Sequence, residues 1–446
     1  MSKGFLSDRA LTFTPSVIQE TSRLAERCGA INLAEGFPDF AAPSLLKEEA
    51  IKAIIEDLNQ YRHVPQLCEL IAKRFSARHG SVHPPLQIDP ATEVVITCGQ
   101  TEAMAAAVLA VVNPGDEVVL FNPTYETYPA NVAMAGGVVR HCQLYPPNWS
   151  FREEELLAAV GPRCKAIVVN SPHNPTGKVF TDAELAIIAR VCTSENLLAL
   201  TDEVYEDLTY DDVEHRSLAS FPGMRERTVV TSSLSKTFSV TGWRIGWAIA
   251  PPDIASAISN LHVKLTDSAP APFQEAAVSA LQSDVSYYRQ LRQEYQERRD
   301  LVCDALEGEE FEIETRPKGG FFVFARIPER FRHGCDDVSF VSTLIEEAGV
   351  AIVPGSIFFH SPSPRASVTG GSAVANGTRT AGPGDDGSPH LTGHASVDEI
   401  INENQDYCST LSTDYSKEYV RVAICKKKET LKAAISELQH YFDNTD

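Results

Sequence analysis

The sequence predicts an α/β protein with a large domain around a mostly parallel, seven-stranded sheet and a smaller α+β domain. Short apolar runs rich in Val and Ile alternate with amphipathic helical stretches, as in β-α units whose parallel sheet is covered on both faces. After residue 285 the sequence changes to strongly charged helical segments. The chain has 446 residues, and one core seldom grows beyond about 250–300 residues.

The large domain is expected over residues 45–285. Amphipathic stretches at 101–112 and 181–191 are typical of the helices between its strands. Ligands of such sheets bind near the carboxyl ends of the strands, so polar residues at those ends are candidates for a site. The seven predicted strands are the apolar runs at 93–97, 117–121, 138–144, 166–170, 197–201, 228–232 and 245–250.

The small domain is expected over residues 286–446, and we expect residues 1–44 to form an N-terminal segment that joins it. A charged amphipathic helix opens the domain, runs at 320–327 and 350–355 are predicted strands, and 429–442 is a predicted closing helix. Residues 361–396 interrupt the domain with seven Gly, four Pro and six Ser. Such a segment buries too little apolar surface to offset the entropy lost on ordering, so we expect a flexible insert.

The composition argues against nucleic acid and membranes as partners. Lys and Arg total 39 against 60 Asp and Glu, which gives a formal charge of −21, and an acidic surface repels anionic polymers and lipids. The N-terminal sequence lacks the apolar stretch of a signal peptide, and no window approaches the roughly 20 apolar residues of a membrane span. Ten scattered cysteines show neither a C-x-x-C pair nor the spacing of a zinc site. We therefore expect reduced thiols, no metal and a cytoplasmic protein.

The most informative segment for chemistry is TSSLSKTFSVTGWRIGW at 231–247. Lys236 follows a predicted strand and has small, hydroxylated neighbours, which is unusual for a lysine on a surface helix. Desolvation and nearby cations lower a lysine pKa and leave its amine free to attack an aldehyde. Ser233, Ser235 and Arg244 offer donors for a phosphate. Most lysines are solvated, however, so a surface lysine remains an alternative at this point.

Three upstream segments add weaker indications. The turn NSPHNPTGK places Asn170 and Asn174 near the end of a strand, although these are also ordinary turn residues. Asp202 ends another strand three residues before Tyr205, a position at which an acidic residue is often only a helix cap. Gly99, Gln100 and Thr101 lie at a strand–helix junction, where free N–H groups suit a phosphate.

Seven motifs occur together in one order: INLAEGFPDF at 31–40, NQY at 59–61, NPTYETY at 122–128, NSPHNPTGK at 170–178, DEVY at 202–205, SLSKTFSVTGWRIGW at 233–247 and YVRVAI at 419–424. In this order they resemble the fold-type I, class I/II aminotransferases that depend on pyridoxal 5′-phosphate (PLP), and within them the kynurenine and glutamine aminotransferase branch. The resemblance runs from about residue 30 to the C-terminus, apart from the insert.

The resemblance implies a PLP site with Lys236, Asp202 and Tyr205 as its catalytic residues. Lys236 would carry the cofactor as a Schiff base and shuttle protons. Asp202 would pair with the ring nitrogen and keep it protonated. Asn174 and Tyr205 would hydrogen-bond the phenolic oxygen, and Tyr125 would stack on the ring.

The resemblance also assigns the cofactor's phosphate group. Arg244 and Ser233 would hold it, together with backbone N–H groups in the segment Gly99, Gln100 and Thr101. Tyr61 would reach the phosphate of a neighbouring subunit, which implies a homodimer with shared active sites.

For the substrates, an amino acid and a 2-oxo acid, the resemblance implies a site around Arg421. Its planar guanidinium suits the α-carboxylate, whereas a surface arginine on an edge strand is the plainer alternative. Gly36 and Asn174 would complete the site.

The expected activity is amino-group transfer between an amino acid of sizeable side chain and a 2-oxo acid by a ping-pong mechanism. One departure keeps other reactions open: the chain continues NQY with RHVPQLCELIAKRF and has no glycine before Gly80, so Arg62 or His63 is a candidate for substrate contact. The alternatives are a β-lyase, an amino-acid oxidase or a cyclase on the same scaffold, and more remotely a non-catalytic PLP-binding regulator. His63 and His173 are further candidates for catalysis, or for structural hydrogen bonds.

Overall fold

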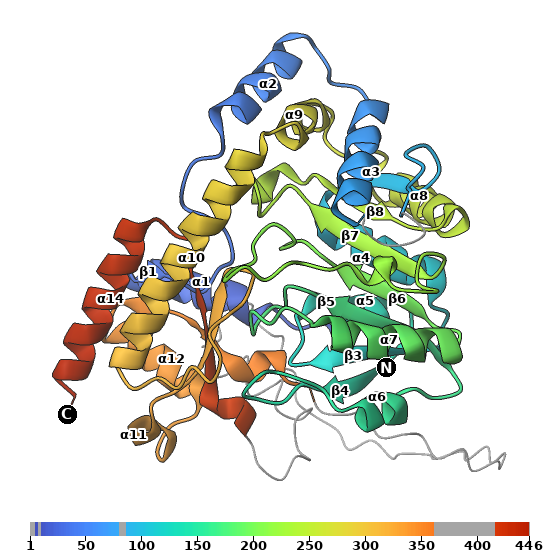
Figure 1. Cartoon of the computed structure of the whole chain (residues 1–446). Coiled ribbons are helices and arrows are strands. Elements are labelled where there is room, and N and C mark those ends of the chain that lie inside the picture. Colours follow the sequence, from blue (N-terminus) through green and yellow to red (C-terminus); the bar gives the residue numbers. More distant parts are fainter. Residues whose placement is uncertain (1–4, 8–9, 80–85, 361–414, 446) are drawn as a thin grey trace, which may run out of the picture.

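The structure, a computed structural model, describes residues 5–7, 10–79, 86–360 and 415–445 (Figure 1). Its centre is a seven-stranded sheet in the order β2-β8-β7-β6-β5-β3-β4, in which β8 alone runs antiparallel to its neighbours. All seven predicted strands are present. Their bounds are β2 Val94–Thr97, β3 Glu117–Asn122, β4 Val138–Gln143, β5 Cys164–Asn170, β6 Leu198–Asp202, β7 Thr228–Ser233 and β8 Gly246–Ile249.

Helices cover both faces of this sheet. Val118 and Leu120 of β3 pack with α4 (Gly99–Val111), α5 (Thr127–Met134) and α8 (Pro252–Thr266). The alternate residues Val119 and Phe121 pack on the other face, with α6 (Glu153–Ala159) and α7 (Asp182–Ser194). Both faces of the inner strands are buried, so their sequences are mostly continuous apolar runs rather than alternating apolar and polar residues. Near β2 and β8 the cover is α2 (Ser44–Ile55), α3 (Pro65–His79) and α9 (Ala271–Leu281).

The smaller sheet is antiparallel, in the order β11-β12-β9, with bounds Val353–Pro354, Tyr419–Ala423 and Phe322–Arg326. The run at 350–355 was expected to form one strand, but the structure divides it. Its first part, β10 (Val350–Ala351), pairs in parallel with β1 (Ile31–Asn32), and β11 pairs with β12. The pairing of β1 with β10 joins the N-terminal segment to the chain that leads into the smaller sheet.

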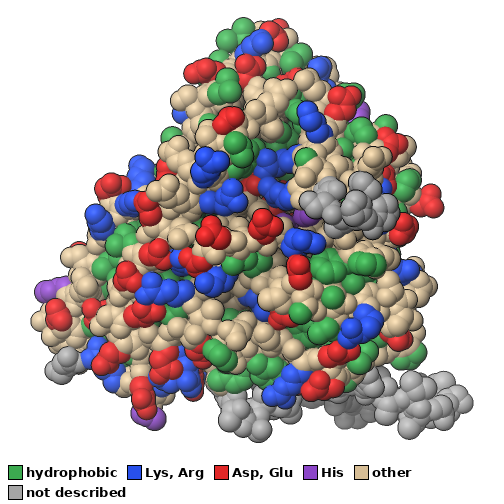
Figure 2. Space-filling model, in the orientation of Figure 1, with side chains coloured by type: hydrophobic (Ala, Val, Ile, Leu, Met, Phe, Trp, Pro, Cys, Tyr) green, Lys and Arg blue, Asp and Glu red, His purple; other side chains and the backbone are tan. Residues whose placement is uncertain are grey.

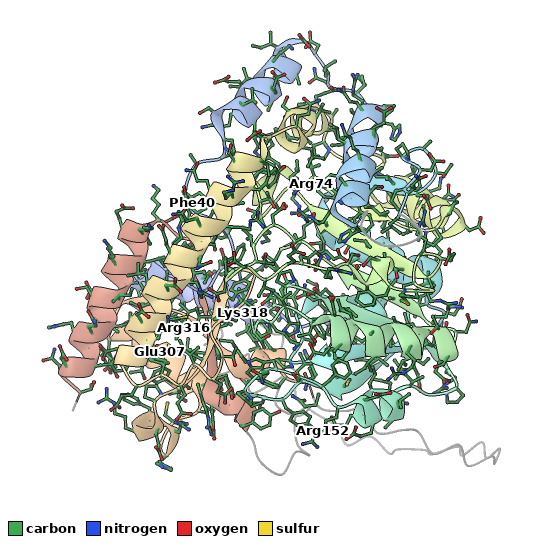
Figure 3. The ribbon with its side chains drawn as sticks, in the orientation of Figure 1. Phe40, Arg74, Arg152, Glu307, Arg316 and Lys318 are labelled. Atoms are coloured by element: carbon green, nitrogen blue, oxygen red, sulfur yellow. The ribbon has the colours of Figure 1, made fainter. Side chains whose placement is uncertain are left out.

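Helices α1 (Val17–Cys28), α11 (Glu329–Arg332), α12 (Asp337–Glu346) and α14 (Lys428–Asp443) surround the smaller sheet. The long helix α10 (Val285–Gly308) runs from the region of α9 down to α14 (Figure 1). Arg299 of α10 donates two hydrogen bonds of 2.8 Å to the carboxylate of Asp211, and Lys318, marked in Figure 3, reaches the same carboxylate at 2.8 Å. Asp211 lies in the loop after β6, so these contacts connect the two sheets.

The flexible insert expected at 361–396 lies outside the described residues, and the domain boundaries at 44/45 and 285/286 stay predictions. In the described part of the chain, no helix combines the length and the apolar character needed to cross a membrane.

Candidate active site

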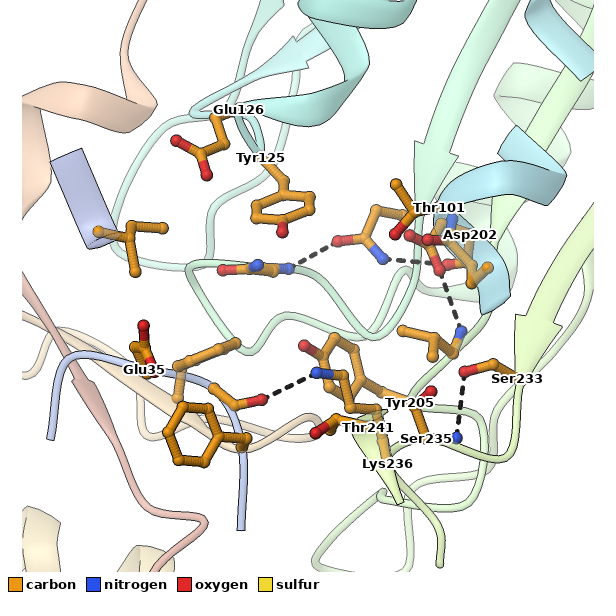
Figure 4. A pocket seen from close by; sticks show the side chains of 18 of the residues that line it. Glu35, Thr101, Tyr125, Glu126, Asp202, Tyr205, Ser233, Ser235, Lys236 and Thr241 are labelled. Carbon is orange, nitrogen blue, oxygen red and sulfur yellow. Dashed lines mark hydrogen bonds between the residues drawn. The ribbon is translucent and has the colours of Figure 1, made fainter. Parts of the chain in front are cut away.

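A cavity of about 430 Å³ lies where the carboxyl ends of the central strands meet the small domain and the N-terminal segment. Its lining combines polar and charged side chains that are far apart in the sequence (Figure 4). Eleven of the thirteen predicted site residues line it: Gly36, Gln100, Thr101, Tyr125, Asn174, Asp202, Tyr205, Ser233, Lys236, Arg244 and Arg421.

The other two predicted residues lie elsewhere. Gly99 does not line the cavity, and a Cβ at this position would overlap the guanidinium of Arg244. Its φ of +80° is a conformation that glycine adopts without strain. Tyr61 is 79% exposed and does not line this cavity.

Lys236 occupies the turn directly after β7, and its side chain points into the cavity (Figure 4). Its Nζ donates a 2.8 Å hydrogen bond to the carbonyl oxygen of Gly36 and lies 5.2 Å from the ring centre of Phe321. Burial lowers the pKa of Lys236 to about 8, and the positive charges of Arg421 and Arg244 act in the same direction. A considerable fraction of the amine is therefore neutral, and nucleophilic, near neutral pH.

Asp202 is the last residue of β6 and is buried. Its Oδ2 accepts a 2.7 Å hydrogen bond from the hydroxyl of Tyr128, and its Oδ1 accepts one of 3.1 Å from the backbone N–H of Val204. Burial raises the pKa of Asp202 to about 6, although both hydrogen bonds oppose the rise. A cationic partner within the cavity would stabilise the ionised form of this buried carboxylate most strongly.

A chain of hydrogen bonds connects Asp202 with Arg421. Asn170 Nδ2 donates to the carbonyl of Asp202 at 3.0 Å, and Asn170 Oδ1 accepts the N–H of Asn174 at 2.7 Å. Asn174 Oδ1 in turn accepts from Arg421 Nη1 at 3.0 Å. These bonds therefore fix the position of Asp202 relative to Arg421 in the cavity.

Arg421 is 1% exposed and belongs to β12, the central strand of the smaller sheet, so the alternative of a surface arginine on an edge strand is wrong. Its guanidinium carbon lies 4.0 Å from the ring centre of Phe322, and Nη2 donates to the carbonyl of Ala34 at 2.9 Å. Its buried Nε has no hydrogen-bond partner among the described residues. Burial lowers the pKa of Arg421 to about 10, which still leaves a cation able to pair with a carboxylate.

At the other end, the amino terminus of α4 faces Arg244. Gln100 and Thr101 belong to the first turn of α4, whose N–H groups have no partner within the helix. Arg244 donates to the carbonyls of Thr241 at 2.9 Å and Cys98 at 3.3 Å, and these bonds fix its guanidinium over that turn. A helix terminus beside a guanidinium is a suitable site for a phosphate.

Tyr125 and Tyr205 supply the aromatic part of the wall. Burial raises the pKa of Tyr125 to about 12 and that of Tyr205 well above its ordinary value, so both hydroxyls remain donors. The ring of Tyr205 meets that of Phe321 edge-on, with centroids 4.9 Å apart. An aromatic ligand therefore finds flat surfaces and fixed hydroxyl donors in one cavity.

These groups fit PLP by their chemistry: phosphate donors at one end, a buried carboxylate for the ring nitrogen, hydroxyl and amide donors for the phenolic oxygen, and a largely desolvated amine for the aldehyde. The cavity volume lies within the range of small-molecule sites. No cluster of His, Cys, Asp or Glu in the described residues is placed to hold a metal ion.

Several lining residues were absent from the predicted set, notably Tyr128, Glu126, Ser16 and Gln19. Ser16 Oγ donates to both carboxylate oxygens of Glu126, at 2.9 and 3.1 Å. Tyr128 and Glu126 belong to the motif NPTYETY at 122–128, in which only Tyr125 had been assigned a role. Ser16 and Gln19 come from a segment without a chemical motif.

The two candidate histidines do not line the cavity. His173 is buried and contacts Thr176 Oγ1 at 2.8 Å, and burial lowers its pKa to about 3. These features support the structural alternative for His173. His63 is exposed.

The carboxyl edge of a mostly parallel sheet, covered by helices on both faces, holds a buried lysine, a buried carboxylate and a helix terminus suited to a phosphate. This arrangement defines a fold-type I PLP-dependent transferase. Residues 29–377 match the family described as aminotransferase class I and II. The chain belongs to this family: its cofactor is PLP, its activity is amino-group transfer, and its substrates are amino acids and oxo acids. This confirms the resemblance inferred from the motifs.

Individual relatives differ in what their names say they act on. A protein of Mycobacterium tuberculosis named as a probable N-succinyldiaminopimelate aminotransferase is 39% identical over 352 residues, 78% of this chain and 87% of its own length. The kynurenine–oxoglutarate transaminase of Dictyostelium discoideum is 35% identical over 390 residues, 79% of this chain and 88% of its own. The solved structure of the N-succinyldiaminopimelate aminotransferase of M. tuberculosis superposes with a TM-score of 0.81 at 34% identity, covering 98% of this chain and 99% of that one.

Proposed function

We propose that the chain transfers amino groups by a ping-pong reaction in which Lys236 is both the attachment point for PLP and the proton carrier. PLP, when bound, supplies the aldehyde that takes up the amino group and a ring that withdraws electrons. Lys236 removes the proton from the substrate Cα, which requires an amine that is neutral near the working pH. The observation that carries this proposal is the buried Lys236 amine in one cavity with Asp202 and Arg421.

The remaining cofactor contacts follow from the same cavity. Asp202 pairs with the ring nitrogen, and Asn174 and Tyr205 donate to the phenolic oxygen. Tyr125 stacks on the ring. The phosphate group is held by Ser233, Arg244 and the first turn of α4, namely Gly99, Gln100 and Thr101.

Arg421 binds the α-carboxylate of the amino acid, with Gly36 and Asn174 beside it. Its Nε, which has no partner within the described part of the chain, and its position on a central strand support this role. The preferred amino donor has a sizeable side chain. The names of relatives, which refer to N-succinyldiaminopimelate and kynurenine, support that class of substrate.

The active form is a homodimer in which Tyr61 reaches the phosphate of the neighbouring site. The exposure of Tyr61, and its absence from the lining of the cavity in its own subunit, support this arrangement. We also propose a cytoplasmic location, supported by the nine described cysteines, all of which are free thiols.

The test is Lys236→Ala beside a matched control, Lys426→Ala. Both lysines donate to carbonyls of the N-terminal segment, Lys236 to Gly36 and Lys426 to Phe37 at 2.9 Å, but Lys426 does not line the cavity. Borohydride reduction of the PLP-loaded protein followed by peptide mass spectrometry locates the attached cofactor. We expect the label on Lys236 in the control and no label in Lys236→Ala, with turnover lost.

Covalently bound cofactor on another lysine in Lys236→Ala would overturn the assignment. The ping-pong order is tested separately with an amino donor alone. That half-reaction should yield one equivalent of oxo acid and of pyridoxamine phosphate, and a 2-oxo acid should reverse it. Ammonia or peroxide as products would instead indicate a lyase or an oxidase.

A further inference from the structure

One lining residue without an assigned role lies directly beside the predicted catalytic carboxylate. Tyr128 is 4% exposed and belongs to the first turn of α5, and its hydroxyl donates to Asp202 Oδ2 at 2.7 Å. The other oxygen of the carboxylate accepts the N–H of Val204 at 3.1 Å. Each oxygen of Asp202 thus has one fixed donor, and these two bonds determine the plane of the carboxylate. Each oxygen keeps a lone pair for a further partner.

The electrostatic surroundings of Asp202 make this hydroxyl important. Lys236, in the turn after β7, is the nearby cation, and Glu203, the next residue in the chain, is a like charge that disfavours ionisation. Burial disfavours the carboxylate further. The uncharged groups that favour the ionised form of Asp202 are those that donate hydrogen bonds to its carboxylate oxygens. Tyr128 is the side chain that donates such a bond.

Tyr128 remains a donor throughout the working pH range. Burial raises the pKa of its hydroxyl well above the ordinary value, and the adjacent Asp202 carboxylate adds to the rise. The ring is held by Tyr125, whose centroid lies 5.8 Å away at an interplanar angle of 80°. The hydroxyl is therefore a permanent dipole directed at one oxygen.

We propose that Tyr128 is a positioning residue that keeps Asp202 ionised and correctly oriented for the ring nitrogen of PLP. This inference rests on the proposed role of Asp202. A carboxylate held in this way stabilises a protonated ring nitrogen, and the protonated ring is the better electron acceptor. Tyr128 acts through Asp202 and takes no part in proton transfer to the substrate.

The chain offers a matched control for the test. Tyr295 is fully buried, and its hydroxyl has no hydrogen-bond partner in the described structure. Tyr295→Phe therefore removes a buried hydroxyl without removing a bond, whereas Tyr128→Phe removes the same atom together with its bond to Asp202. Both variants keep the ring and its packing.

The principal measurement is the ¹⁵N resonance of the ring nitrogen in holoenzyme loaded with ¹⁵N-labelled PLP, followed against pH. In Tyr128→Phe we expect the ring nitrogen to lose its proton at a pH lower by about one unit or more than in the wild type, because a hydrogen bond to a charged group is lost. The dissociation constant of PLP should rise about tenfold or more for the same reason. Tyr295→Phe should match the wild type in both measurements.

The Asp202→Asn variant distinguishes a failure of the inference about Tyr128 from a failure of the proposed role of Asp202. If Asp202→Asn moves the ring-nitrogen titration and Tyr128→Phe does not, the positioning role is overturned while the role of Asp202 stands. If neither variant moves it, the proposed role of Asp202 fails as well. Equal effects of Tyr128→Phe and Tyr295→Phe would also overturn the inference, since they would show only the cost of altering a buried tyrosine.

Discussion

At the scale of single residues, Lys236 owes its reactivity to its position rather than to its type. An exposed lysine is almost fully protonated near pH 7, whereas burial lowers the pKa of Lys236 to about 8. Below that pH the neutral fraction of the amine rises about tenfold per unit, and above it the fraction levels off. The amine attacks an aldehyde only in its neutral form.

The rate at which PLP attaches to the cofactor-free protein should follow this titration. We expect the rate to increase up to about pH 8 and then to become flat, as measured by stopped-flow absorbance of the bound cofactor. An exposed lysine analogue, Nα-acetyl-lysine, serves as the control, and its rate should keep rising towards about pH 10.5. A rate for the protein that also rises through pH 10 would contradict a lowered pKa.

The residues of this cavity also show which members of a site a single sequence predicts and which it does not. Lys236, Asp202 and Arg421 were predicted because each lies in a motif with a distinctive order of residue types. Tyr128 also lies in such a motif, NPTYETY at 122–128, but its role was not predicted, because it depends on a hydrogen bond to Asp202, 74 positions further along the chain. Contacts of that kind leave no local pattern in a single sequence.

At the scale of elements, the start of α4 is packed closely against its neighbours. A Cβ on Gly99 would overlap the guanidinium of Arg244, and one on Gly246 of β8 would overlap the backbone between Gly99 and Gln100. The helix terminus and the arginine proposed to hold the phosphate therefore depend on two glycines. The geometry of the proposed phosphate site therefore depends on this packing.

Gly99→Ala should weaken PLP binding by tenfold or more, because the new methyl group displaces Arg244. Gly115→Ala is the matched control: its φ of +86° imposes a similar backbone strain of about 1–2 kcal/mol, but no atom lies within 4 Å of the new Cβ. Equilibrium titration with PLP and thermal unfolding of both variants separate the two effects. If both lose stability but only Gly99→Ala loses affinity, the close approach to Arg244 matters for binding. Equal affinities would contradict this account.

The secondary structure was predictable to very different degrees in the two sheets. The strands of the large sheet carry their own signal, since burial on both faces favours continuous apolar runs such as those in β3 and β5. The two-residue strands differ: the apolar run at 350–355 predicted a strand where β10 and β11 lie, but it carried no signal for their separate partners. Their existence depends on partners more than 60 residues away in the chain, such as Arg421 opposite Val353, so the split of 350–355 could not be foreseen.

At the scale of the whole molecule, the cavity is closed by contacts between separate parts of the chain. Lys236 donates a hydrogen bond to Gly36 and Arg421 donates one to Ala34, so the N-terminal segment lies over the site.

Hydrophobic side chains lie among charged ones at the apex of the molecule, where α2 lies (Figure 2). On α2, Leu45, Ile51, Ile54 and Ile55 are each at least half exposed. An exposed apolar surface of this kind supports an interface with a second copy.

A hybrid dimer tests this arrangement directly. Subunits carrying Tyr61→Ala and Lys236→Ala, co-expressed with different tags, should form a hybrid in which one site has both Lys236 and the partner's Tyr61. We expect each parent dimer to be inactive at limiting PLP, and the doubly purified hybrid to recover about half of the wild-type activity, because one of its two sites is intact. If Tyr61 served its own subunit instead, the hybrid would be as inactive as its parents. If the chain were a monomer, no hybrid would be isolated, and the proposal of shared active sites would fail with it.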